Sequence, residues 1–218
     1  MTDLAAPRRF VVLISGRGSN MQHIVEQAQK SHCRAEFVRV IANQANAQGL
    51  EWARAQGIPT SVVEHHEFAT RELFDERLAE IIEPEKPDYV ILAGFMRILT
   101  PGFVARFQDR LINIHPSLLP AFPGLKTHAR ALAAGVGWHG CTVHFVTDDL
   151  DHGPIIAQAA VAVRAGDTAD SLAQRVLEAE HALYPRVIQW LAEGRVRVGS
   201  AGKVSIDGVE DRNIWMSV

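Results

Sequence analysis

FVVLISGRGSNMQHIVEQAQK, residues 10–30, is a short apolar run that leads through a glycine turn into a segment of helical character. The run 10–14 carries no polar side chain, which is typical of a strand buried on both faces of a sheet. From Asn20 to Lys30 the apolar residues are spaced as on a helix that covers such a sheet. This order of strand, turn and helix predicts an α/β fold.

The same alternation continues to the middle of the chain. We expect further strands at residues 35–43, 59–63, 88–94 and 111–115, and further helices at 45–56 and 70–82. Near-continuous apolar strands separated by helices form parallel sheets that are covered on both faces. The expected fold class is therefore α/β, with a Rossmann-like, mostly parallel sheet flanked by helices.

Two later apolar segments, at 141–153 and 154–167, follow one another with no room for a helix between them. They predict two antiparallel strands late in the chain. A long helix should then run from Thr168 to about Glu193. We expect Pro185 to interrupt this helix, because proline cannot donate the helical hydrogen bond.

The last part of the chain, residues 195–218, alternates in the manner of a hairpin, with Gly199 and Gly202 near its turn. We find no repeat, linker or low-complexity tract that would divide the chain. The sequence therefore predicts a single domain over residues 1–218, with a core at about 10–194 and a hairpin-like tail.

The composition restricts the classes of partner. The 218 residues carry a net charge of −3, so no bulk positive field favours nucleic acid or an anionic membrane. The apolar run 10–14 is far too short for a membrane span or a signal-peptide core. We therefore expect a soluble, cytoplasmic protein without nucleic-acid or membrane partners.

Metal and disulfide chemistry are not expected either. Cys33 and Cys141 lack metal-site spacing and are interpreted as reduced thiols. His65 and His66 are adjacent, but no further ligands follow at a spacing that would complete a metal site. The sequence predicts no metal centre.

The turn SGRGSN, residues 15–20, is called the glycine loop below. Gly16 and Gly18 allow a tight bend, after which the N–H groups of Gly18, Ser19 and Asn20 would point outward and bind an anion such as phosphate. The loop is no dinucleotide fingerprint, because the third glycine would fall at Met21. A tight strand-to-helix connection, with Ser19 or Asn20 as the helix cap, is the alternative.

The strand LINIH, residues 111–115, ends in an amide and an imidazole. Asn113 and His115 project on the same face, and Pro116 then ends the strand. Ligands bind beyond the carboxyl ends of parallel strands, so this pair is placed for chemistry under a proline-rich cover. The alternative is a buried structural histidine beside an asparagine that caps a turn.

The chemistry of this pair suggests acyl transfer. An asparagine amide can donate to a carbonyl oxygen that gains charge, and histidine exchanges protons near neutral pH. Asp148, Asp149 and Asp151 are nearby carboxylate candidates. The chain has no G-x-S-x-G nucleophile elbow, so direct transfer between two bound substrates fits better than a covalent intermediate.

Five motifs, in order between about Phe10 and Trp190, together resemble the phosphoribosylglycinamide formyltransferase family. They are SGRGSN, AGFMRIL, NIHPSLLPAFPG, HGCTVHFVTDDLDHGP and EHALYP. The resemblance implies the formyltransferase fold and an enzyme of de novo purine biosynthesis. Such an enzyme would transfer the formyl group of 10-formyltetrahydrofolate to the amine of N1-(5-phosphoribosyl)glycinamide through a tetrahedral intermediate, without a metal.

The resemblance also implies roles for individual residues. Asn113 would bind the formyl oxygen, His115 would stabilise the tetrahedral intermediate and move a proton, and Asp151 would favour the charged form of His115. The ribonucleotide would contact Gly18, Ser19, Asn20 and, at its glycinamide end, Glu180. The folate would contact Arg71, Met96, Arg97, Ile98, Leu99, Asn113, Thr147, Asp148 and Asp151.

Plainer interpretations stand beside these roles. Arg71 and Glu180 would ordinarily be solvated helix residues, and Met96 would ordinarily fill the core. His144 would ordinarily be a hydrogen-bonded sheet residue, and His128 and His139 receive no role.

Other functions use the same residues. A formyltetrahydrofolate deformylase would keep Asn113, His115 and Asp151 and use water as the acceptor. It usually carries an N-terminal regulatory domain, for which a first strand at about residue 10 leaves no room. A methionyl-tRNA formyltransferase would need a further C-terminal domain and a basic face. A non-catalytic nucleotide-binding module would use the glycine loop for phosphate, with the loop at His115 and Pro116 as scaffold. The sequence leaves open whether the chain is a monomer or a homodimer.

Overall fold

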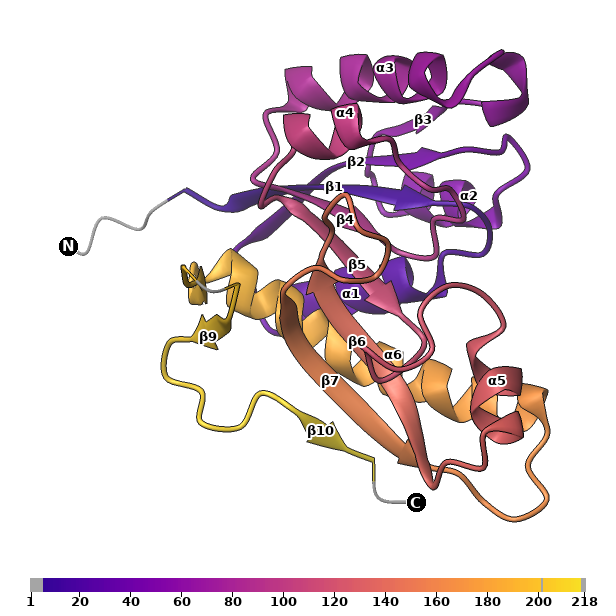
Figure 1. Ribbon diagram of the computed structural model, residues 1–218. Helices are drawn as coiled ribbons and strands as arrows, with labels where there is room; N and C mark the ends of the chain where they lie inside the picture. Colours follow the sequence, from indigo (N-terminus) through magenta and orange to yellow (C-terminus); the bar gives the residue numbers. More distant parts are fainter. Residues whose placement is uncertain (1–5, 201, 217–218) are drawn as a thin grey trace.

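The computed structural model describes residues 6–200 and 202–216, so residues 1–5, 201 and 217–218 of the predicted domain lie outside it. An eight-stranded sheet forms the centre, in the order β10-β7-β6-β5-β4-β1-β2-β3 (Figure 1). Strands β8 and β9 form a separate two-stranded sheet. The strands are β1 (Arg8–Ile14), β2 (Ala35–Ala42), β3 (Thr60–Val62), β4 (Tyr89–Leu92), β5 (Leu111–His115), β6 (Trp138–Phe145), β7 (Ile155–Ala162), β8 (Val196–Val198), β9 (Val204–Ile206) and β10 (Ile214–Trp215).

Helices connect the strands and cover the sheet. The α-helices are α1 (Ser19–Lys30), α2 (Gln48–Ala55), α3 (Arg71–Ile82), α4 (Pro101–Arg106), α5 (Thr127–Ala133) and α6 (Ala169–Ala192), and the 3₁₀ turns are η1 (His65–Glu67) and η2 (Glu83–Glu85). Strands β1 to β5 pair in parallel, as the sequence predicts for apolar runs separated by helices. The expected Rossmann-like sheet is confirmed.

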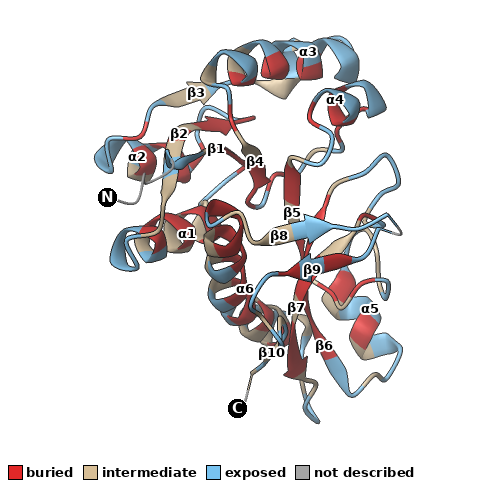
Figure 2. Ribbon diagram, turned by 90° about the vertical axis from the view of Figure 1, so that its left-hand side faces the viewer, coloured by how far each residue is buried: buried red, intermediate tan, exposed pale blue. Residues whose placement is uncertain are grey.

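The first strand serves two cores, because successive side chains point to opposite faces. Phe10, Val12 and Ile14 pack with buried residues of α1, α2 and α6, whereas Val11 and Leu13 pack with those of α3 and α4. All five side chains are fully buried. Figure 2 shows the middle of the sheet as buried between its helices. This two-sided burial explains why the run 10–14 contains no polar residue.

The parallel order ends at β5. Strand β6 is antiparallel to β5, and β7 is antiparallel to β6, as predicted for two late strands without an intervening helix. Strands β8 and β9 pair antiparallel, as predicted for a hairpin, and the Gly199 N–H donates to the Lys203 carbonyl at 2.9 Å. The short strand β10 was not predicted and pairs in parallel with β7 at the sheet edge.

Helix α6 corrects one prediction, because it runs unbroken from Ala169 to Ala192 with Pro185 inside it. Proline removes one helical hydrogen bond, typically at a cost of about 3 kcal/mol. The neighbouring Tyr184 and Val187 are fully buried, and this packing maintains the helix across the proline. The Tyr184 hydroxyl lies 3.1 Å from the carbonyl oxygens of both Leu92 and Ile112, which joins α6 to β4 and β5.

Across residues 6–200 and 202–216, no helix combines the length and the apolar character that crossing a membrane would require.

Candidate active site

Several regions that the sequence singled out converge because β1, β4 and β5 are neighbours in the sheet. The glycine loop follows β1, and β5 ends at His115. Residues 96–99 follow β4 and are named the folate segment below, after the role that the family resemblance implies for them. Ile112 and Ile114 belong to the core on the α1 and α6 side, so Asn113 and His115 point to the opposite face. The β6–β7 loop, residues 146–154, lies over that face.

Asp151, in the β6–β7 loop, lies beside His115. Its Oδ2 atom is 3.4 Å from His115 Nδ1, and both side chains are more than nine-tenths buried. The Gly124 N–H donates to the same Oδ2 at 2.8 Å. On the other side of the ring, His115 Nε2 lies 3.1 Å from the Phe122 carbonyl oxygen. Each ring nitrogen therefore faces an oxygen that accepts hydrogen bonds, so either nitrogen can hold a proton.

Asn113 is oriented by His144, a residue to which the sequence gave no site role. The two residues are directly opposite in the β5–β6 pair, and Asn113 Nδ2 lies 3.3 Å from His144 Nε2. His144 Nδ1 lies 2.9 Å from the Phe145 carbonyl, which only accepts, so this nitrogen carries the proton. His144 Nε2 is then an acceptor for one Asn113 proton, and the second amide proton stays available for an acyl oxygen.

The neutral state of His144 agrees with its environment. Burial lowers the pKa of His144. The Phe145 carbonyl and Asp151 raise it, but they offset only part of the effect of burial. His144 Nε2 lies 4.0 Å from Asp151 Oδ1, so one imidazole borders both Asn113 and Asp151. The only sequence cue was alternation, which places His144 on the same face of β6 as the buried Thr142.

The glycine loop has the form that anion binding requires. Gly18 is the N-cap of α1, with φ of 68°, and no side chain caps the helix, so neither Ser19 nor Asn20 acts as the cap. The first helical hydrogen bond runs from the Gln22 N–H to the Gly18 carbonyl at 2.9 Å. The N–H groups of residues 19–21 precede this bond and have no partner within the helix.

Helix α2 supports the glycine loop from behind, which the sequence analysis missed. The Gly49 N–H donates to the Gly16 carbonyl at 3.1 Å. A Cβ atom at Gly49 would lie 2.6 Å from the Ile14 Cδ1 atom and 3.1 Å from the Arg17 carbonyl oxygen. A side chain at this position would therefore require the Ile14 side chain and the loop backbone to shift.

Asn20 and Glu180 form a buried pair between α1 and α6. Asn20 Nδ2 donates to Glu180 Oε2 at 2.7 Å, and the two residues are only 7% and 8% exposed. Burial raises the pKa of Glu180 to about 7, against the opposing effect of the Asn20 hydrogen bond. The plainer alternative, a solvated Glu180, is therefore wrong, and contact with the ribonucleotide stays a prediction. The Asn20 side chain is engaged here, and its backbone N–H is the group left for a phosphate.

The folate segment is fixed at both ends. The Met96 N–H donates to Ser15 Oγ at 2.8 Å, and the Thr100 N–H donates to Asp75 Oδ2 at 2.6 Å. Between these anchors the Met96 side chain is 70% exposed, so it does not fill the core, and Leu99 is buried. The Arg97 guanidinium lies 5.8 Å from the centre of the Phe74 ring on α3.

The remaining folate candidates are peripheral in this structure. Thr147 and Asp148 are exposed in the β6–β7 loop, where Thr147 Oγ1 donates to the Asp149 carbonyl at 3.3 Å. Arg71 begins α3, as predicted, and is exposed.

Two further histidines lie behind the proline-rich segment. His139 Nε2 is 3.2 Å from His128 Nδ1, and His139 packs edge-on against Phe122, whose carbonyl faces His115. Burial, followed by the charges of His128 and His115, lowers the pKa of His139 to about 4. Burial likewise lowers the pKa of His128. These two imidazoles are neutral and pack behind the proline-rich segment that contains Phe122.

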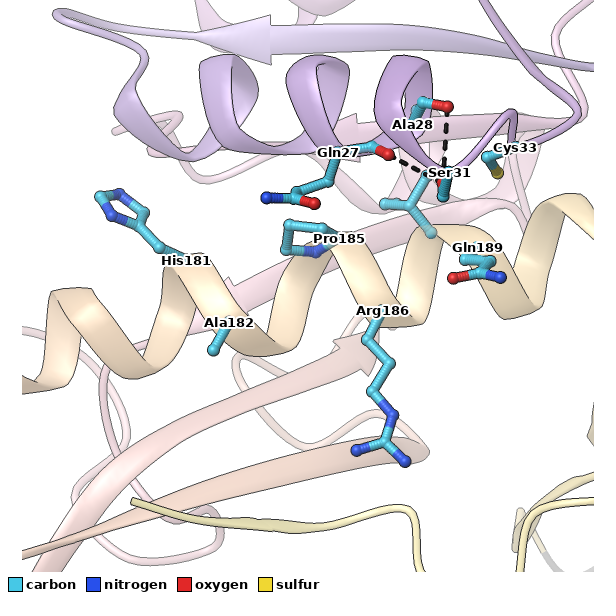
Figure 3. Close-up of a pocket in the computed structure, with 10 residues that line it drawn as sticks. Gln27, Ala28, Ser31, Cys33, His181, Ala182, Pro185, Arg186 and Gln189 are labelled. Carbon is cyan, nitrogen blue, oxygen red and sulfur yellow. Dashed lines mark hydrogen bonds between the residues drawn. The ribbon is translucent and has the colours of Figure 1, made fainter. Parts of the chain in front are cut away.

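A groove of about 290 Å³ lies between α1 and α6, but the predicted catalytic and folate residues do not line it (Figure 3). Its lining residues are Gln27, Ala28, Ser31, Cys33, His181, Ala182, Pro185, Arg186, Ile188 and Gln189. His181 points toward α1 and stacks on His23 with ring centres 3.6 Å apart. Burial lowers the pKa of His181 to about 4, with a smaller contribution from the charge of His23.

Within the part of the chain that the structure describes, no three or more His, Cys, Asp or Glu side chains are grouped as a metal site would require.

Comparisons of sequence identify the family. Residues 8–188 match the family model described as formyl transferase. The phosphoribosylglycinamide formyltransferase of Escherichia coli (strain K12) is 50% identical over 189 residues, 87% of this chain and 89% of the relative. The trifunctional purine biosynthetic protein adenosine-3 of Gallus gallus is 44% identical over 90% of this chain, which spans only 20% of that longer protein.

Comparisons with solved structures point to the same family. The phosphoribosylglycinamide formyltransferase of Anaplasma phagocytophilum has a TM-score of 0.89 at 41% identity, over 96% of this chain and 99% of its own. A formyltetrahydrofolate deformylase of Pseudomonas syringae pv. tomato has a TM-score of 0.85 at 27% identity, over 93% of this chain and 66% of its own. The chain therefore belongs to the formyl transferase family and, within it, to the phosphoribosylglycinamide formyltransferases.

Proposed function

We propose that the chain transfers a formyl group from 10-formyltetrahydrofolate to the amine of N1-(5-phosphoribosyl)glycinamide, by direct transfer between the two bound substrates. The observation that carries the proposal is the group of Asn113, His115 and Asp151, in which the His115 and Asp151 side chains are buried together and Asn113 lies on the same strand as His115. A tunable acid and an amide donor are what acyl transfer needs, whereas a site that only binds a nucleotide needs neither.

The reaction starts with attack of the neutral substrate amine on the formyl carbon. A carbon–nitrogen bond forms, and the carbonyl oxygen becomes an oxyanion. The free Asn113 amide proton stabilises that oxyanion, the positive charge of a protonated His115 adds to this, and Asp151 keeps the His115 ring in position. The intermediate then collapses with cleavage of the bond to the folate nitrogen. That nitrogen gains one proton while the attacking amine loses one, and His115 moves this proton through bound water.

The ribonucleotide occupies the glycine-loop side of the site. Its phosphate accepts hydrogen bonds from the N–H groups of Gly18, Ser19 and Asn20, which the Gly18 cap leaves without side-chain competition. Glu180 meets the glycinamide end. With a pKa of about 7, its carboxyl group can hold or release a proton near neutral pH.

The folate occupies the opposite side. Backbone groups of the folate segment read the pterin, because the Ser15 and Asp75 anchors fix the ends of this segment. Thr147, Asp148 and Asp151 form the second wall, and Arg71 meets the folate tail. We propose these contacts residue by residue from the family resemblance. The exposed Met96 and Ile98 side chains support it, because they are available to an apolar ligand.

The test is release of tetrahydrofolate from 10-formyltetrahydrofolate, measured with and without the ribonucleotide. Turnover that depends on the ribonucleotide and collapses in His115→Ala supports the transferase. Turnover without the ribonucleotide identifies a deformylase, and binding of both substrates without turnover identifies a binding module. His66→Ala is the matched control, because the His66 side chain is 67% exposed and lies outside the proposed site.

A further inference from the structure

Ser15 occupies a position that the proposed reaction does not explain. It is the first residue after β1 and the first residue of the glycine loop, and it is only 8% exposed. Its hydroxyl oxygen accepts the Met96 N–H at 2.8 Å, across 81 positions of sequence. Met96 is the first residue of the folate segment. One hydroxyl therefore joins the starting points of the two proposed substrate regions.

The sheet explains why these residues meet. Strands β1 and β4 are parallel neighbours, and their pairing runs from Phe10 opposite Tyr89 to Leu13 opposite Leu92. The Ala93 N–H then donates to the Leu13 carbonyl at 2.9 Å. Beyond this point β4 has ended and β1 pairs only with β2, at Ile14, so a side-chain hydroxyl replaces the backbone acceptor. The Ser15–Met96 bond therefore continues the contact between β1 and β4 past the end of their ladder.

The folate segment needs such an anchor. Gly94, with φ of 74°, turns the chain out of β4, and the Met96 side chain that follows is largely exposed. Of the two described anchors, Asp75 belongs to α3 and touches the segment near Thr100 only. Of the two anchor residues, Ser15 and Asp75, only Ser15 belongs to the glycine loop. The serine hydroxyl is therefore a direct link between the glycine loop and the folate segment.

We propose that Ser15 is a positioning residue that couples the two half-sites, so that binding of either substrate tightens binding of the other. This inference rests on the proposed function, because it takes the glycine loop as the ribonucleotide region and residues 96–99 as the folate region. Coupling between binding sites is reciprocal, so the ribonucleotide must change folate affinity by the same factor as the reverse. Ser15 touches neither reacting atom, and its effect is on affinity.

The test measures the Kd of tetrahydrofolate by calorimetry, with and without a saturating concentration of the ribonucleotide. We expect the ribonucleotide to tighten tetrahydrofolate binding by about fivefold or more in the wild type, the lower range of allosteric coupling. In Ser15→Ala this factor falls to about one, because the hydroxyl is lost. Ser15→Thr keeps the hydroxyl and should recover most of the factor.

Asp75→Ala is the matched variant at the other anchor. It should weaken tetrahydrofolate binding but preserve the coupling factor, because Asp75 does not contact the glycine loop. Three results would overturn the inference: equal coupling in wild type and Ser15→Ala, no coupling in the wild type, or equal loss in Asp75→Ala. Thermal unfolding identifies a variant that has not folded, in which case Ser15→Thr and Asp75→Ala decide.

The proposed reaction and the proposed coupling through Ser15 can be disproved separately. Wild-type turnover that requires the ribonucleotide sustains the proposed function whatever the coupling factor is. Absence of turnover, with both ligands bound and coupled through Ser15, overturns the function and leaves the coupling in place.

Discussion

The glycine loop and the catalytic group are built from different parts of the chain. The loop is made of backbone: a glycine cap in the left-handed region, N–H groups ahead of the first helical bond, and a second glycine against it from α2. The catalytic group is made of side chains, with His115 held between the Asp151 carboxylate and a backbone carbonyl. The loop should therefore be sensitive to backbone shape, and the catalytic group to the loss of single functional atoms.

The strongest test of this contrast is His115→Ala. General acid–base catalysis typically contributes about 10² to 10⁴ in rate, and we expect kcat/KM to fall by this range. Steady-state kinetics measures the loss. The Kd of the ribonucleotide should stay within about twofold of wild type, because His115 makes no contact with the glycine loop. A comparable loss of ribonucleotide affinity would contradict the separation of the two regions.

Removal of the amide donor comes next. Asn113→Ala should lower kcat by about 10² to 10³, the usual effect of losing one oxyanion donor, with little change in either KM. His144→Ala is the informative companion, because it leaves the Asn113 amide in place but removes its partner at 3.3 Å. A smaller loss of kcat in His144→Ala than in Asn113→Ala would assign orientation to His144. Equal losses would contradict that assignment.

Glu180 provides a test on stability. Its pKa is 4.5 in the unfolded chain and about 7 in the folded one, so the folded protein prefers the protonated form. The corresponding stability is complete below pH 4.5 and is lost as pH rises through 7, with a total of about 3 kcal/mol. Denaturant unfolding between pH 5 and pH 8 measures it.

Glu180→Gln should remove most of this pH dependence, because glutamine keeps the acceptor for Asn20 and does not ionise. His139 and His181 act in the opposite direction. Their pKa values of about 4 in the fold, against 6.5 unfolded, give stability that is present above pH 6.5 and lost as pH falls toward 4. If the free energy of unfolding changes with pH as steeply in Glu180→Gln as in the wild type, a group other than Glu180 causes the change.

A methyl group behind the glycine loop should act on one substrate only. Gly49→Ala places a Cβ against the Ile14 side chain and the Arg17 carbonyl, and we expect the KM of the ribonucleotide to rise about tenfold. The KM of the folate should change less than threefold. Gly102→Ala is the matched control, since a Cβ there meets nothing within 4 Å. Equal effects of the two variants would contradict the supporting role of α2.

The smallest effect is expected at Arg17. This residue is exposed within the glycine loop. Its carbonyl oxygen accepts a hydrogen bond from Gln22 Nε2 at 3.0 Å. Exposed charge pairs contribute up to about 1 kcal/mol, so Arg17→Ala should raise the KM of the ribonucleotide by no more than about fivefold. A larger rise in the KM of the ribonucleotide, together with wild-type binding that weakens as salt is added, would show that the Arg17 side chain contacts the phosphate.

The contrast between the two regions also explains what the sequence could predict. Apolar runs and glycine turns are local signals, and they correctly located the five parallel strands and the helix that starts at Ser19. The proximity of Asn113 and His115 followed from strand alternation. Contacts between distant segments left no local signal, so Gly49 behind the loop, His144 opposite Asn113 and Glu180 inside the protein emerged only from the structure.

The same reason accounts for the error at Pro185. The local rule that proline breaks a helix is correct about the lost hydrogen bond, but tertiary burial of Tyr184 and Val187 outweighs it. The short helices α4 and α5 were missed because six and seven residues carry too little periodicity to be recognised. The strand β10 has two residues and exists only through its pairing with β7.

The Tyr184 hydroxyl, placed between the carbonyls of Leu92 and Ile112, has a consequence for synthesis on the ribosome. The centre of the sheet is translated early, yet the helix that seals one of its faces is among the last elements to leave the exit tunnel. Domains generally fold as units, so β1 to β5 must wait, with apolar surface uncovered, until about residue 190 has emerged. A nascent chain arrested before α6 should therefore be a client of chaperones, and one arrested after it should not.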